Sequence, residues 1–318
     1  MEMVLKLLKN AMIAKSATSN GYLIDGYPRQ VEQGVAFEQD ITPCRGVLYF
    51  EVSDEEMTQR LLKRGETSGR VDDNEETIKS RLVTFHQATA PVTTHYHQQK
   101  KLHKINAERD PDAIFADVEK SLDQIILADC KVLFVVGGPG SGKGTQCTRL
   151  INKYNLTHIC SGDLLRDEVA SGSKLGKSLA LTMKRGDLVG LETVLTLIRN
   201  AMVKAALAGS DGFLIDGYPR EIKQGAVFES LIKACDACVY FNCCDETMVN
   251  RLLVRAKAEN ADDDEERIRK RLAIFHNSTQ PVVDHYKAKK KLIEVISEGD
   301  VDEVYADGVV ALAPIFEV

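Results

Sequence analysis

Short apolar runs alternate with helical segments in the second half of the chain. Residues 131–136 (KVLFVV) are apolar almost throughout and end in glycines, and residues 145–154 then carry apolar side chains at helical spacing. Further apolar, β-prone runs stand at 213–216, 238–242 and 293–297. Because such runs are apolar on both faces, they are typical of parallel strands buried between helices. The pattern predicts an α/β fold with a parallel sheet covered on both faces.

Two charged segments show the helical period more clearly. Ile268, Leu272 and Phe275 form an apolar stripe on the segment 264–280, which predicts an amphipathic helix. The opening MEMVLKLLKNAM has a lysine inside its apolar stretch and no small-residue cleavage site, so we expect an amphipathic helix there and no signal peptide.

The chain also repeats itself. Three stretches of the first half match three of the second: 21–38 with 212–229, 47–64 with 238–255, and 72–92 with 262–282. Met1 aligns with Leu191, and the segment from Lys131 to Gly190 has no counterpart upstream. We therefore predict two domains, an incomplete repeat at 1–126 and a complete domain at 131–318.

Composition narrows the class of protein. The 318 residues fit two units of ordinary domain size, and hydrophobic and charged fractions of 44% and 28% suit a soluble globular chain. A net charge of −6 offers no broad basic field for nucleic acid, and no apolar run of membrane-spanning length occurs. We expect a monomer in the cytoplasm that binds small molecules and neither nucleic acid nor membrane.

The cysteines raise a second question. Eight cysteines without a secretory segment indicate reduced thiols. Cys235, Cys238, Cys243 and Cys244 suggest zinc by their number, but they lie on an apolar, β-prone run and lack a second separated pair. We interpret them as small buried hydrophobic residues.

The stretch GGPGSGKGT at 137–145 carries the clearest chemistry. It follows a predicted strand and precedes a predicted helix, which is the context that a phosphate loop requires. Glycines let backbone N–H groups approach phosphate oxygens, and Lys143 adds a positive charge. Gly144 stands where the strict motif has Ser or Thr, with Thr145 one residue later.

Further motifs follow in order: SGDLLR (161–166), RGDLV (185–189), and LIDGYPR with Gln224 after it. Together with the phosphate loop, they resemble the adenylate kinase family, in particular its short-lid cytosolic type. The resemblance covers 131–318 throughout and 1–126 as a partial copy, like the tandem members of the family. It implies a P-loop nucleoside monophosphate kinase with a parallel five-stranded sheet, preceded by an incomplete repeat of that fold.

The resemblance also implies roles for individual residues. ATP would be held by Gly140, Ser141, Gly142, Lys143, Gly144, Thr145, Arg255 and Gly299. AMP would be held by Ser161, Arg166, Asp187, Leu188, Val189, Gly217, Tyr218, Pro219, Arg220, Gln224 and Arg271. Lys143, Arg220, Arg255 and Arg271 would be catalytic, and Asp216 would orient water on Mg²⁺.

The implied activity is reversible phosphoryl transfer from Mg-ATP to AMP, giving two ADP, with ATP, AMP and ADP as ligands. Arginines suit this chemistry because a planar guanidinium can bind two phosphate oxygens at once. Two alternatives stay open: a UMP/CMP kinase, and a nucleotide-binding regulator with little turnover. Gln224 and the hydroxyl of Ser161 favour AMP as the acceptor.

The lid sequence departs from the family in the second copy. The first copy reads RGETSGRVDD and keeps Arg70, whereas the second reads RAKAENADDD and has Asn260 or Ala261 at that position. Lys257 could replace part of the lost charge. We expect the second unit to be active but impaired, because a lost phosphate donor weakens transition-state stabilisation by a few kcal/mol.

The first copy departs further. It keeps an acceptor-side and lid set of Asp25, Arg29, Gln33, Arg64, Arg70 and Arg81. It lacks the phosphate loop and the GDLLR segment, and Arg109 stands where the second copy has Gly299. By the family's topology the missing strand lies between those of LIDG and VLYF, so two strand edges should be unsatisfied. An omitted upstream segment is the favoured explanation, with a degenerate interaction unit or completion by another chain as alternatives.

Some repeated or charged residues suggest no chemistry. His86 and His276 occupy matching positions, as do His95 and His285, and we interpret them as helix-surface or packing residues. The lysines near 287–291 are expected to be solvated, and Arg251 is as readily a solvated charge as a ligand.

Overall fold

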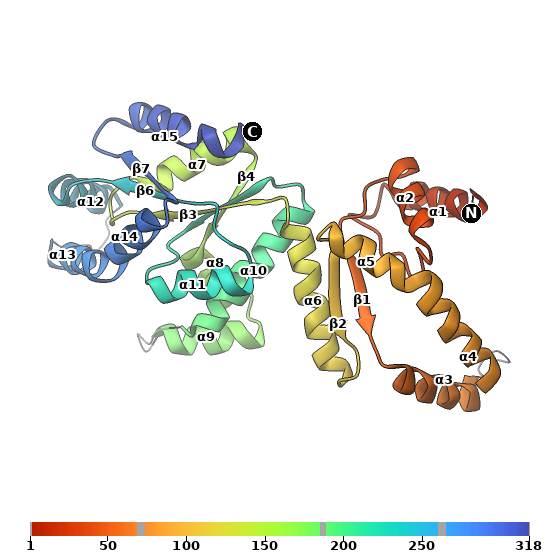
Figure 1. Cartoon of the computed structure of the whole chain (residues 1–318). Helices are drawn as coiled ribbons and strands as arrows, with labels where there is room; N and C mark the ends of the chain where they lie inside the picture. The colour runs from red at the N-terminus through yellow and green to blue at the C-terminus, as the bar shows by residue number, and fades with distance from the viewer. Residues whose placement is uncertain (1, 69–73, 185–188, 260–264, 318) are drawn as a thin grey trace. The chain divides into compact units, whose positions relative to one another are not determined.

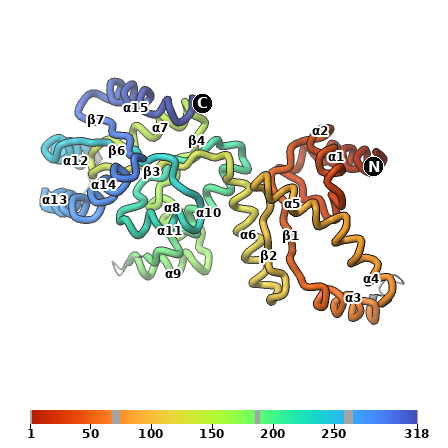
Figure 2. Tube along the Cα trace, in the orientation of Figure 1, coloured from red at the N-terminus to blue at the C-terminus, as the bar shows by residue number. Residues whose placement is uncertain are grey.

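The computed structural model divides into two compact units, Met1–Ile125 and Ile126–Val318, which are described separately (Figures 1 and 2). Among the residues that it describes, no helix combines the length and apolar character needed to cross a bilayer. The described residues are 2–68, 74–184, 189–259 and 265–317.

The second unit is built on a five-stranded sheet in the order β4-β5-β3-β6-β7, in which every neighbouring pair is parallel. The strands are β3 (Lys131–Val136), β4 (Leu156–Cys160), β5 (Gly212–Asp216), β6 (Ala237–Asn242) and β7 (Leu292–Ile296). The predicted parallel five-stranded sheet is confirmed. The four apolar runs that the sequence indicated lie within one residue of β3, β5, β6 and β7, whereas β4 was not among them.

Helices cover both faces of this sheet (Figure 1). Those whose side chains enter the two cores against the sheet are α7 (Lys143–Tyr154), α8 (Ser161–Ala170), α10 (Leu191–Leu207), α11 (Ile222–Leu231), α14 (Gln280–Ala288) and α15 (Val301–Phe316). The other helices are α9 (Lys174–Lys184), α12 (Asp245–Glu259) and α13 (Glu265–Ile274), and the last two form a small core of their own. A π-helical turn, η2 (Phe275–Thr279), joins α13 to α14, so the predicted amphipathic helix continues to Ala288.

The central strand β3 explains why both faces are covered. Val132, Phe134 and Val136 pack into one core with residues of α10, α11 and α14, whereas Leu133 and Val135 pack into the other with α7 and α15. Each of these five side chains is at most 3% exposed. Because alternate residues of a strand point to opposite faces, an apolar run is stable only between two helical layers.

The strand order also locates the site. The chain moves from β3 outward to β4, returns to β5 beside β3, and then crosses to β6 on the other side. The order therefore reverses at β3. In open α/β sheets, ligands bind at the carboxyl ends of the strands where the order reverses.

The first unit repeats the second half of this fold. Its elements are α1 (Glu2–Lys15), α2 (Val31–Asp40), β1 (Val47–Glu51), α3 (Asp54–Ser68), α4 (Glu75–Thr84), η1 (Phe85–Thr89), α5 (Ala90–Gln98), β2 (Leu102–Asn106) and α6 (Pro111–Leu127), of which the last two residues belong to the second unit. β1 and β2 pair in parallel from Val47↔Leu102, as β6 and β7 do from Cys238↔Leu292. The predicted helix at the N-terminus is present as α1.

In the part of the chain that the structure describes, the first unit has no counterpart of β3, and its number of strands is smaller than the sequence predicted. Residues 21–24, which match most of β5, form no strand, so one open strand edge is left there, that of β1, where one edge on each of two strands was expected. Leu23 is 81% exposed, whereas its counterpart Leu214 is fully buried. An isolated strand segment has no partner for its backbone groups, and residues 21–24 therefore do not adopt the extended ladder.

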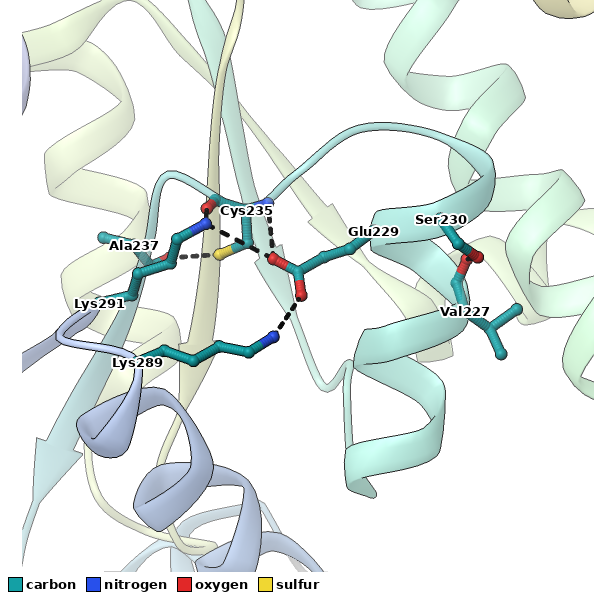
Figure 3. Close-up of polar contacts among 7 residues, drawn as sticks. All are labelled: Val227, Glu229, Ser230, Cys235, Ala237, Lys289 and Lys291. Atoms are coloured by element: carbon teal, nitrogen blue, oxygen red, sulfur yellow. Dashed lines mark hydrogen bonds and ion pairs between the residues drawn. The ribbon is translucent and has the colours of Figure 1, made fainter.

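A polar network just before β6 joins Glu229 and Cys235 to two lysines, Lys289 and Lys291 (Figure 3). The Glu229 carboxylate accepts from the backbone N–H of Cys235 (3.1 Å) and lies 3.2 Å from Nζ of Lys289, while Lys291 donates to the carbonyl oxygen of Cys235. Lys289 is exposed, as expected for a solvated lysine, although it pairs with Glu229, whereas Lys291 is half-buried and its interpretation as a solvated lysine is wrong. Cys235 itself is buried, as expected.

Of the other clustered cysteines, Cys238 and Cys243 are buried, but Cys244 is exposed. Cys244 lies past the end of β6, where the chain leaves the sheet for α12. The interpretation of the whole cluster as buried is therefore wrong for Cys244.

The repeat allows a matched test of the role of β3. Leu214→Ala removes a side chain packed against β3 and α7, and should lower the free energy of unfolding of the second unit by about 2–5 kcal/mol. Leu23→Ala changes an exposed side chain and should cost no more than about 0.5 kcal/mol. Urea unfolding followed by circular dichroism measures both, and equal losses would contradict the account.

Candidate active site

The glycine-rich loop lies between the end of β3 at Val136 and the start of α7 at Lys143. Gly140 and Gly142 have φ of +86° and +83°, which favour glycine. At Gly140 a side chain would also approach the carbonyl oxygen of Met248 to 2.6 Å. The loop therefore depends on glycine twice, for its conformation and for its contact with α12.

A hydrogen bond between two serines holds the loop against the end of β7. Ser141 is fully buried, and its carbonyl oxygen accepts a hydrogen bond of 2.6 Å from the hydroxyl of Ser297, which follows β7. Gly144 and Thr145 are exposed in the first turn of α7. The N-terminus of that helix and the loop amides make a site suited to an anion.

The Lys143 side chain folds back over the loop, where its Nζ donates to the carbonyl oxygen of Gly138 at 3.3 Å. Burial lowers the pKa of Lys143, the Asp216 carboxylate opposes that shift, and the Arg271 and Arg220 guanidinium groups add to it. The structure therefore brings these four predicted site residues into one electrostatic neighbourhood.

Asp216 ends β5 and is 8% exposed. Its Oδ2 atom lies 3.4 Å from Nε2 of His158. Its Oδ1 atom is buried and has no hydrogen-bond partner in the described part of the chain. A buried carboxylate oxygen with open lone pairs beside Lys143 fits an acceptor for water on Mg²⁺, the role that the resemblance implies.

The turn after β5 carries Arg220. Gly217 has φ of +72°, and its carbonyl oxygen accepts hydrogen bonds of 3.1 Å from the Ser161 hydroxyl and from Nε of Arg220. The Tyr218 hydroxyl donates to the carbonyl oxygen of Gln224 (2.6 Å), and the Gln224 side chain accepts from the backbone N–H of Arg220 (2.8 Å). Ser161 thus joins the end of β4 to this turn.

The remaining acceptor-side residues are partly described. Pro219 is buried within the turn. Arg166 is exposed on α8 and forms an ion pair with Asp163, whose pKa it lowers. Val189 is half-buried before α10. Asp187 and Leu188 lie outside the described residues.

The lid arginines come from two helices. Arg255 is exposed on α12, and Arg271 is exposed on α13, where its charge acts on Lys143. Arg70, Asn260 and Ala261, which distinguish the two lids in the sequence, lie outside the described residues, so the expected effect of the missing arginine stays a prediction.

Arg251 has a role that sequence reasoning missed. Its guanidinium donates to the carbonyl oxygens of Ser297 (2.8 Å) and Gly299 (3.2 Å), and its side chain is half-buried. It therefore fixes the loop that carries Gly299, a predicted ATP contact, and is no simple solvated charge. A signal was present, because Arg60 occupies the same position in the first copy.

The repeated histidines form surface ion pairs. Nε2 of His276 lies 2.9 Å from Asp245, and Nε2 of His86 lies 2.9 Å from Asp54, at matching positions in the two units. In the second unit the pair links the first residue of α12 to η2, and in the first unit it links the first residue of α3 to η1. The interpretation of His86 and His276 as helix-surface residues is confirmed.

The fold and site together define a P-loop α/β protein: a glycine-rich loop between a buried parallel strand and a helix, at the edge where the strand order reverses. The family model described as "Adenylate kinase" matches residues 1–101 and 135–291. The chain belongs to the adenylate kinase family, as the motifs predicted.

Individual relatives match at different lengths. Adenylate kinase isoenzyme 5 of Homo sapiens is 35% identical over 350 residues, covering 93% of this chain and 62% of the relative. The isoenzyme 5 of Mus musculus matches over the same shares, so this chain spans about three fifths of those relatives. Adenylate kinase isoenzyme 1 of Caenorhabditis elegans is 53% identical over 180 residues, covering 56% of this chain and 86% of the relative.

Two glycines of the loop region make a matched pair for a test. Gly140→Ala should lower the free energy of unfolding by at least about 1–2 kcal/mol, since φ is positive and Met248 blocks the new methyl group. Gly144→Ala has open space within α7 and should change it by less than about 1 kcal/mol, with stabilisation as the expected sign. Thermal or urea unfolding decides, and a Gly140→Ala protein as stable as Gly144→Ala would refute the steric argument.

Proposed function

We propose that the second unit transfers the γ-phosphoryl group of ATP to AMP, reversibly, giving two ADP. One observation supports this most strongly: the charges of Asp216, Arg220 and Arg271 all act on Lys143, which follows a phosphate loop at the carboxyl edge of the sheet. Membership of the adenylate kinase family and the names of the relatives agree with it.

The chemistry asks for alignment and charge, and for no protein nucleophile. An oxygen of the AMP phosphate attacks the γ-phosphorus, a new P–O bond forms, and the bond to the β-phosphate oxygen breaks. Lys143 and the loop amides would hold the donor phosphates, while Arg220 and Arg271 would neutralise the acceptor and the group in transit. Each cation contributes by its fixed position, which the loop, the turn and α13 provide.

Magnesium would accompany ATP. Asp216 is the residue that would hold its water shell, through the open Oδ1 atom, and Mg²⁺ would neutralise charge on the β- and γ-phosphates. The positive charge of Lys143 lies in the same neighbourhood and would add to this neutralisation.

AMP is the proposed acceptor. Ser161 and Gln224, the residues that favour AMP in the sequence, both bond to the turn that carries Arg220. The cytoplasmic location, the monomeric state and the restriction to small-molecule ligands stay predictions from the sequence.

Lys143→Met tests the proposal most simply. A coupled assay with Mg-ATP and AMP should show turnover that falls at least about 100-fold in the variant, the usual cost of removing one preorganised donor. Lys153→Met, an exposed lysine near the end of the same helix, is the matched control and should keep wild-type turnover. Wild-type transfer to CMP or UMP in preference to AMP would overturn the proposed acceptor.

The pH dependence follows from the lowered pKa of Lys143. The charged amine is the form that binds phosphate, so kcat/KM for ATP should fall as pH rises through a value below the ordinary 10.5. Lys143→Arg keeps its charge at every working pH and should move this alkaline limb upward. A pH profile of both proteins checks this, and an alkaline limb that is the same in both would assign it to another group.

A further inference from the structure

The main chain of Arg220 is held on both sides by side chains of other elements. Its N–H donates to Oε1 of Gln224 on α11 (2.8 Å), and its carbonyl oxygen accepts from the Thr279 hydroxyl on η2 (3.3 Å). A third bond directs the side chain, since Nε of Arg220 donates to the carbonyl oxygen of Gly217 (3.1 Å). Both the position and the direction of the guanidinium are therefore fixed by short contacts.

The first unit supplies an internal control. The N–H of Arg29 donates to Oε1 of Gln33 (2.8 Å), the Thr89 hydroxyl donates to the Arg29 carbonyl oxygen (3.4 Å), and Nε of Arg29 donates to the Gly26 carbonyl oxygen (3.1 Å). The described part of this unit contains no phosphate loop and no counterpart of α8. The contacts therefore form without the rest of the site and belong to the turn itself.

The hydrogen-bond chemistry identifies the atom involved. A backbone N–H can only donate, so the side-chain atom facing Arg220 must be the amide oxygen of Gln224, and the same holds for Gln33. The Gln224 side chain is thus directed at the arginine turn before any base is bound.

We propose that Gln224 and Thr279 are positioning residues that clamp the main chain of Arg220, so that its guanidinium is preset for the acceptor phosphate. This inference rests on the proposed function for the identity of the ligand. It adds to Gln224 a role independent of the base, because the clamp acts on the phosphate end of the acceptor.

The clamp is expected to matter because arginine is long and loses rotamer freedom when it binds. The contact of Nε with Gly217 removes part of that loss before the acceptor arrives, and the two main-chain contacts fix the point from which the side chain extends. A misplacement of about 1 Å at a reacting centre can cost about 100-fold in rate. Loss of the clamp should lower kcat/KM for AMP and leave KM for ATP unchanged, since Arg220 belongs to the acceptor side.

A double-mutant cycle tests whether Gln224 acts through Arg220. Gln224→Met is expected to lower kcat/KM for AMP by about 10- to 100-fold with KM for ATP unchanged. In an Arg220→Ala background, the same substitution should cost less than about 2-fold, because its target is gone. A residue that acts only by reading adenine would cost the same in both backgrounds, and that result would overturn the proposal.

Gln33→Met is the matched control in the first unit and should leave turnover unchanged. Amide hydrogen exchange supplies a readout that needs no activity. Gln224→Met should remove protection at the Arg220 N–H and leave Arg29 protected, while Gln224→Glu, which keeps an acceptor, should preserve it. Thr279→Val should lower kcat/KM for AMP in the same direction as Gln224→Met.

The outcomes are separable. A wild-type chain without phosphoryl transfer would refute the proposed function, and exchange would then decide whether the clamp exists. An active chain in which Arg220 keeps its protection after Gln224→Met would refute the clamp alone.

Discussion

The pairing of β3 on both edges and its burial on both faces is the constraint on which the second unit depends. Val132 to Val136 are apolar on both sides, so the strand is stable only in the middle of the sheet between two helical layers. That position sets the phosphate loop at the centre of the carboxyl edge. The other parallel strands end at the same edge, where Asp216 ends β5, Ser161 follows β4 and Ser297 follows β7.

The first unit shows what survives without that strand. β1 and β2 keep the register of β6 and β7, and the turn around Arg29 keeps the hydrogen bonds of the turn around Arg220. Residues 21–24 lose their strand and Leu23 is exposed. Two of the three hydrogen bonds at Arg29 join residues three or four positions apart, and the third comes from Thr89, which the first unit also contains. A strand at 21–24 would instead require a neighbouring strand to pair with.

The same distinction explains what the sequence could predict. The apolar runs, the glycine loop and the ordered motifs were sufficient for four of the five strands, the sheet and the family, because each signal is local. β4 was missed because LTHIC alternates polar and apolar residues and is not an apolar run. Arg251 and Lys291 were misjudged because their partners, Ser297 and Cys235, are more than forty residues distant. The two roles proposed for Gln224 could not be separated from the sequence either, since one side chain can serve a base and a backbone N–H. The number of open strand edges could not be predicted, because it depended on whether residues 21–24 would form a strand without a partner.

The central claim is that, of the two GYPR turns, only the one that carries Arg220 belongs to a complete site. The most direct measurement is ADP formation from Mg-ATP and AMP in the full chain with Arg220→Ala and, separately, with Arg29→Ala. The account predicts that Arg220→Ala lowers kcat/KM for AMP by at least about 100-fold, and that Arg29→Ala leaves it unchanged. Equal losses in the two variants, or a loss with Arg29→Ala alone, would contradict it.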